Sequence, residues 1–150
     1  MPDVRRRVRY CSYLLALVAA TSCLFGVIYI SSSEPMPYHL AFVGMSFEEI
    51  RDVNPNLAAF FTSLIRSLGA CFLGIGIFGI GIAFRYFQRA ERWAWLVVFP
   101  AVSIVLADML RASFLVGADV RWLIVGLTVL FLTAMLVPVK DFFGSRVDER

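Results

Sequence analysis

Charged residues are scarce in this sequence, and the chain has only one histidine and three cysteines. Asp, Glu, Lys and Arg make up 17% of the 150 residues, whereas soluble domains carry roughly 25%. So little charge combined with so much apolar sequence excludes an intrinsically disordered chain and a nucleic-acid-binding domain. We therefore expect no nucleic acid among the partners of this protein.

The single histidine and the few cysteines argue against a disulfide framework, a redox centre or a metal site. Cys11, Cys23 and Cys71 lie in or beside apolar stretches without CxxC spacing, so we interpret them as packing residues. His39 has no cysteine, histidine or suitably spaced carboxylate around it. Because the sequence also lacks a nucleophile paired with a base and any cofactor motif, we expect no metal, no cofactor and no enzymatic activity.

Apolar residues are abundant: they form 60% of the chain, and the mean hydropathy is +0.79. About four membrane spans of roughly 20 residues each would account for most of them. The fold class predicted is an all-α membrane protein, a single domain built as a bundle of four transmembrane helices with a short amphipathic outer helix. The expected spans are residues 10–30, 57–84, 93–110 and 122–139, with an outer loop at 31–56.

Basic residues outside the spans predict the orientation. By the positive-inside rule, the side richer in Lys and Arg is cytoplasmic. This places both termini in the cytoplasm of a multi-pass cell-membrane protein and the loop 31–56 outside. All four spans fit this one orientation when the first is retained, which favours an uncleaved first span over the alternative, a cleaved signal peptide. Ten basic residues lie on one side (Arg5, Arg6, Arg7, Arg9, Arg85, Arg89, Arg92, Lys140, Arg146, Arg150) and three on the other (Arg51, Arg111, Arg121).

The outer loop contains one helix signal. Ser46 and Glu49 fit the S-x-x-E capping box that begins a helix, and Phe47 and Ile50 follow at helical spacing. We expect a short helix with the acids Glu48 and Glu49 on the outer membrane surface, packed over the projecting end of the second span. It is either a lid over apolar surface or a substrate or partner site built from its acids.

The second span is rich in glycine, and its small residues recur every seven positions along two lines. Residues two apart on a helix point about 200° apart, so the two lines occupy nearly opposite faces. Small faces let membrane helices approach closely. We expect this helix at the centre of the bundle, with its glycines serving either packing within the chain or contact with a second copy or a partner subunit. The glycines are Gly69, Gly74, Gly76, Gly79 and Gly81; the lines are Thr62, Gly69, Gly76 and Ala83, and Ser67, Gly74 and Gly81.

Ionisable residues interrupt two of the apolar stretches. Arg66 in the second and Asp108 in the third reach similar depths, about 27 Å and about 22 Å from the cytoplasmic ends of their helices. Arg111 lies one turn beyond Asp108. Because a charge near the bilayer centre costs about 2.5 to 3.5 kcal/mol, we predict an ion pair between Arg66 and Asp108. It is either a structural clamp or an outward-facing site in which Arg66 binds an anionic headgroup or a partner carboxylate.

Four short motifs lie together between about residues 40 and 100: GMSFEEI at 44–50, NPNL at 54–57, Arg66 with Gly69, and RAERWAW at 89–95. This pattern resembles that of small uncharacterised four-helix membrane proteins of prokaryotes. The resemblance implies a four-helix membrane fold and no particular activity.

These features together favour a non-enzymatic integral membrane protein. We expect a structural or accessory subunit of a homo-oligomer or of a larger membrane complex, in contact with membrane lipid. The alternative is a small transporter or a lipid-binding protein that uses the outward-facing polar site. No inverted pair of broken helices is visible in the sequence, which argues mildly against transport by a single copy.

Overall fold

The structure is a computed structural model that describes residues 2–144, and the side chains of residues 5–144. It is all-helical, without a β-strand in this described range. The helices are α1 (Pro2–Ser31), α2 (Pro37–Val43), α3 (Phe47–Val53), α4 (Pro55–Arg85), the 3₁₀ helix η1 (Phe87–Arg89), α5 (Arg92–Val116), α6 (Arg121–Leu136) and α7 (Val139–Phe143).

Four helical segments are long and apolar enough to cross a membrane, as the sequence predicts. They are Arg5–Ser31, Pro55–Arg89, Arg92–Val116 and Arg121–Phe143. The second is the longest because Asn54 and Pro55 start α4 early. The Asn54 side chain accepts hydrogen bonds from the backbone N–H groups of Asn56 and Leu57 at 3.0 and 3.3 Å, and proline suits the first helical position.

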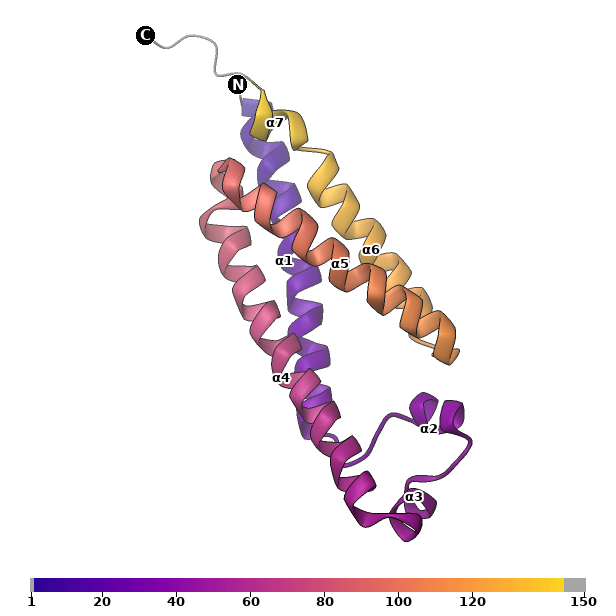
Figure 1. Ribbon diagram of the computed structural model, residues 1–150. Helices are drawn as coiled ribbons and strands as arrows, with labels where there is room; N and C mark the ends of the chain where they lie inside the picture. The colour runs from indigo at the N-terminus through magenta and orange to yellow at the C-terminus, as the bar shows by residue number, and fades with distance from the viewer. Residues whose placement is uncertain (1, 145–150) are drawn as a thin grey trace.

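The long helices form two pairs, α1 with α4 and α5 with α6 (Figure 1). The pairs meet near the N-terminus and α7 and diverge towards α2 and α3. Helix α1 packs against α4, η1 and α6, whereas α4 packs against α1, α3 and η1. The prediction that the glycine-rich helix is central is therefore wrong: α1 holds that place. The physical reason is that, among the described residues, only one of the two small-residue faces of α4 packs closely against another helix.

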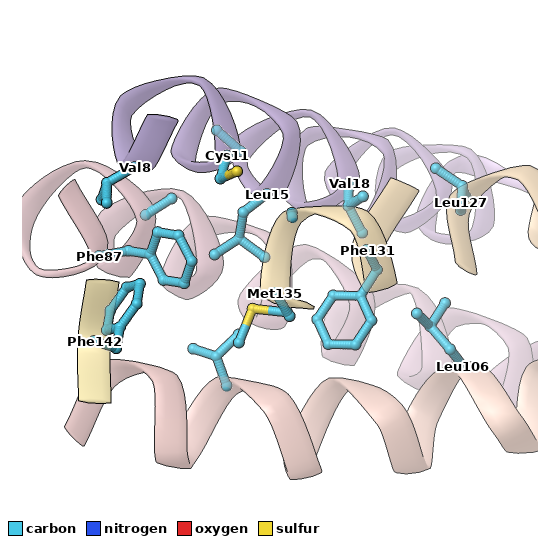
Figure 2. Packing of buried hydrophobic residues seen from close by; sticks show 14 residues of the cluster. Val8, Cys11, Leu15, Val18, Phe87, Leu106, Leu127, Phe131, Met135 and Phe142 are labelled. Carbon is cyan, nitrogen blue, oxygen red and sulfur yellow. The ribbon is translucent and has the colours of Figure 1, made fainter. Parts of the chain in front are cut away.

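The core lies between α1, the end of α4, η1, α5, α6 and α7 (Figure 2). Phe87, Phe131 and Met135 are at most 1% exposed. The rings of Phe87 and Phe142 pack with centroids 4.7 Å apart, and this contact joins η1 to α7. Between membrane helices such close packing stabilises through van der Waals contact, and this core joins the two helix pairs.

Polar contacts gather the chain segments at the same end, which we call the terminal end. Arg92 Nε donates to the Phe142 carbonyl oxygen at 3.0 Å, and Arg7 Nη1 lies 3.7 Å from Asp141 Oδ2. The start of α1, the η1 turn and α7 thus lie together, opposite α2 and α3 (Figure 1). These are the segments that the distribution of basic residues groups on one side. Arg146 and Arg150 lie outside the described residues.

The opposite end, which we call the loop end, carries α2 and α3. The predicted capping box is confirmed: Ser46 Oγ accepts from the Glu49 N–H at 3.2 Å, and Glu49 Oε2 accepts from the Ser46 N–H at 2.7 Å. Helix α3 then packs Phe47 and Ile50 against Ala58 of α4. Helix α2 is an addition to the single outer helix that the sequence predicts. Its signals are Pro37 in the first turn and Gly44, with φ of 74°, just after the last.

Candidate functional site

One small-residue face of α4 contacts the backbone of α1. We call it the first small face, and its residues are Thr62, Gly69, Gly76 and Ala83. A Cβ atom built on Gly69 would lie 2.8 Å from the Ile30 nitrogen, and one on Gly76 would lie 2.7 Å from the Ala19 carbonyl oxygen. Neither position has room for a side chain, so these glycines serve packing within the chain.

Polar hydrogen bonds reinforce this contact. The buried Ser12 hydroxyl on α1 donates to the Ala83 carbonyl oxygen at 2.7 Å. Further along, the Ser22 hydroxyl donates to the Phe72 carbonyl oxygen at 2.9 Å. A hydroxyl that satisfies itself on a neighbouring helix contributes about 1 kcal/mol inside a membrane protein. Ser12 and Ser22 were not predicted as contact residues from the sequence, although small polar residues within the first apolar stretch are a signal of contact between membrane helices.

No helix of the described residues packs closely against the glycines of the opposite face of α4, although Gly74 lines an apolar cleft that α5 also lines and Ser67 lines a polar groove that α3 also lines. We call this face the second small face, and its residues are Ser67, Gly74 and Gly81, all exposed. A Cβ atom built on Gly74 or Gly81 would meet no atom within 4 Å in the described part of the chain. Gly79 belongs to neither small face, but it contacts α1, since its Cβ would lie 2.9 Å from the Ala19 Cβ. The five predicted packing glycines therefore divide into contacting and open positions.

The three predicted intramembrane charges do not form one site. Asp108 pairs with Arg111 on its own helix, with 2.8 Å between Asp108 Oδ1 and Arg111 Nη2, and both side chains are exposed. Arg66 Nε instead donates to the Ser32 carbonyl oxygen at 3.4 Å. The predicted Arg66 to Asp108 ion pair is wrong. Matching depth was not enough, because Arg66 points to the side of α4 that faces α3, while α5 lies across another side.

Arg66 lies in a polar groove at the loop end, which we call the arginine groove. It has a volume of about 680 Å³ and runs between α3 and α4 beside the end of α1. Its polar lining combines two guanidinium groups with several hydroxyls, while Phe47 and alanines form its apolar floor. The polar lining residues are Ser33, Arg51, Thr62, Ser63, Arg66 and Ser67. The sequence assigned Arg51 only to the outer loop, and it reaches this groove because the side of α3 that carries Phe47 and Arg51 faces the groove.

The acids Glu48 and Glu49 do not line this groove. Glu49 completes the capping box, and the Ser46 N–H that donates to its carboxylate holds the pKa of Glu49 below its ordinary value. Glu48 lies exposed on the first turn of α3. Both acids therefore suit the start of a helix, where negative charge is stabilised. The hypothesis that they build a partner site stays a prediction.

An apolar cleft of about 430 Å³ lies between the two helix pairs. Leu15, Phe72, Phe78, Val105 and Met109 are among its lining residues, and none of the lining residues is charged. Its volume is within the range of about 300 to 1,000 Å³ found for ligand pockets. An ion or strongly polar substrate would find no charged partner in this cleft. Charged side chains line two other pockets, the arginine groove and a pocket of about 710 Å³ at the terminal end that includes Arg89, Glu91 and Asp141.

No family model, curated protein or solved structure matches this chain. The resemblance over residues 40–100 stays a prediction.

Proposed function

We propose that this protein is a non-enzymatic integral membrane protein that acts as a structural subunit, assembling with a second copy of itself through the second small face of α4. The observation that carries the proposal is the difference between the two faces of one helix. The first small face is in backbone contact with α1, whereas Gly74 and Gly81 on the second have open space around them.

The helix cost of glycine indicates that the second small face packs against another helix. A glycine inside a helix costs about 1 kcal/mol relative to alanine. Within the chain, close packing with α1 offsets this cost at Gly69 and Gly76, but no contact offsets it at Gly74 and Gly81. Between membrane helices, small residues stabilise association because they let the backbones approach. A second α4 on this face would supply the missing contact.

A second copy fits this face because α4 is self-complementary there. A symmetric contact places the same residues on both sides, so a small face meets a small face. Residues 67–84 contain no Asp, Glu, Lys or Arg, and two copies can therefore approach along this length without like-charge repulsion. The seven-residue spacing of Ser67, Gly74 and Gly81 suits a left-handed crossing of two such helices.

Native mass spectrometry from a mild detergent tests the proposal. The wild-type chain should appear as a homo-oligomer, and Gly74→Leu or Gly81→Leu should shift it to monomer. Gly126→Leu is the matched control, because Gly126 also lies in a long helix with open space around it. A strictly monomeric wild type, or one bound only to other proteins, would overturn self-assembly. Equal effects of Gly74→Leu and Gly126→Leu would also overturn it.

A further inference from the structure

The arginine groove concentrates positive charge that no described acid neutralises. The two ion pairs among residues 5–144 are Arg7 with Asp141 and Arg111 with Asp108, so neither groove arginine takes part in one. Arg51 lies with its guanidinium carbon 5.0 Å from the centroid of the Phe47 ring, a cation–π contact that orients it. Arg66 uses only one N–H donor, on Ser32.

The neighbouring acids of α3 point away from the groove. Phe47 and Arg51 lie four residues apart and both line it. At about 100° per residue, the acids lie roughly 80° to 180° away from that direction around the helix. Arg51 therefore lies on the side of α3 that faces the groove, and the acids lie on its other sides. The acids are Glu48, Glu49 and Asp52.

The groove lies at the depth of lipid headgroups. Arg66 precedes Arg85, the last residue of α4, by nineteen positions, which is about 28 Å along the helix. The hydrocarbon core of a bilayer is about 30 Å thick. With Arg85 at one interface, Arg66 reaches the other, and the part of α4 that begins at Pro55 projects into the headgroup layer together with α3.

We infer that the arginine groove binds the phosphate group of an anionic phospholipid. Guanidinium groups donate paired hydrogen bonds to phosphate oxygens, and the groove has two such groups, Arg51 on α3 and Arg66 on α4. The hydroxyl of Ser63 provides a further donor on α4. Ala70, one turn from Arg66 towards the bilayer centre, continues this lining with apolar surface, which suits the start of an acyl chain. This inference goes beyond self-assembly and does not depend on it.

Thermal unfolding of the full chain in a mild detergent tests the site with three probes. They are 1-palmitoyl-2-oleoyl phosphatidylglycerol, the corresponding phosphatidylcholine, and inorganic phosphate. A ligand that binds only the folded state raises Tm as its concentration exceeds Kd. Phosphatidylglycerol should raise Tm, whereas phosphatidylcholine and inorganic phosphate should leave it unchanged at the same concentrations.

The variants Arg51→Gln and Arg66→Gln should each require about tenfold more phosphatidylglycerol for the half-maximal rise in Tm, since each removes a charge-assisted contact. Arg111→Gln is the matched control, because it removes the same charge from an exposed position outside the groove, and it should keep the wild-type response. Both groove arginines are exposed, so the variants should unfold at the wild-type temperature without lipid.

Three results would overturn the inference. One is an undiminished phosphatidylglycerol response in both Arg51→Gln and Arg66→Gln. Another is an equal response to phosphatidylcholine, which would show that headgroup charge does not matter. The third is an equal rise in Tm with inorganic phosphate alone, which would make the groove a site for a free anion rather than a lipid. None of these results bears on the oligomeric state, so this inference and self-assembly fail separately.

Discussion

Gly26 of α1 and Gly69 of α4 face each other so closely that neither has room for a side chain. A Cβ atom on Gly26 would lie 2.8 Å from the Gly69 carbonyl oxygen, and one on Gly69 would lie 2.9 Å from the Gly26 carbonyl oxygen. The obstructing atoms belong to the backbone, which can give way only if the helices move apart. This mutual contact fixes the separation of α1 and α4.

Replacing Gly69 by alanine should destabilise the protein. Alanine favours the helix by about 1 kcal/mol relative to glycine, but overpacking a close contact typically costs about 1 to 3 kcal/mol. Because backbone atoms obstruct the new methyl group, the cost at Gly69 should lie at the upper end of that range. Thermal unfolding in detergent, followed by circular dichroism, should give a lower Tm for Gly69→Ala. Gly126→Ala is the control, because its Cβ meets nothing within 4 Å, and its Tm should be unchanged or higher. Equal Tm values for the two variants would contradict the close contact.

Removing the Ser12 hydroxyl should weaken the same helix pair. Its bond to the Ala83 carbonyl oxygen is 2.7 Å long, and the side chain is fully buried. Ser12→Ala should lower the free energy of unfolding by about 1 kcal/mol. Ser31→Ala serves for comparison, since the exposed Ser31 hydroxyl bonds only to carbonyls of its own helix. If unfolding showed the same loss for both variants, the inter-helix bond would not be the cause.

The packing of α2 should depend on pH through His39. Burial lowers the pKa of this imidazole below its ordinary value of 6.5, and its ring lies 4.3 Å from that of Tyr38, centroid to centroid. Because the folded pKa is lower than the unfolded one, the stabilisation is full above about pH 6.5 and decreases as the pH falls below it. Amide hydrogen exchange of residues 37–43 should therefore show less protection at about pH 5 than at about pH 7, after correction for intrinsic rates. A His39→Gln variant should lose this difference, and one that kept it would assign the effect to another group.

Length, hydropathy and local signals were sufficient to predict the four long helices and α3, but not the short helices α2, η1 and α7. The four long helices follow from apolar stretches, and α3 follows from the Ser46 and Glu49 capping box, whose geometry depends on neighbouring residues alone. The first small face also follows from sequence, because a seven-residue spacing places Gly69 and Gly76 on one side of a helix.

The arrangement of the helices around one another was not predictable in this way. Depth along a helix can be counted from sequence, and it placed Arg66 and Asp108 at similar depths. The direction in which a side chain points relative to a neighbouring helix depends on which helix faces pack together. Helix α1 packs against both α4 and α6 through contacts of Gly26, Ser12 and Leu15, and the periodicity of a single sequence does not reveal these contacts. The arginine groove was missed because the sequence predicted that α3 packs over the start of α4 but not which side of α3 faces α4, and that direction brings Arg51 into the same groove as Arg66.

Oxidative cross-linking in native membranes tests self-assembly through α4 most directly. In a chain whose Cys11, Cys23 and Cys71 are replaced by alanine, a single cysteine would be introduced by Gly74→Cys or, as control, by Gly126→Cys. A disulfide requires Cα atoms within about 7 Å of each other, a distance that a symmetric contact through the second small face provides at position 74. Self-assembly through α4 should give covalent dimers for Gly74→Cys and few for Gly126→Cys. Equal yields at the two positions, or no dimer at position 74, would contradict it.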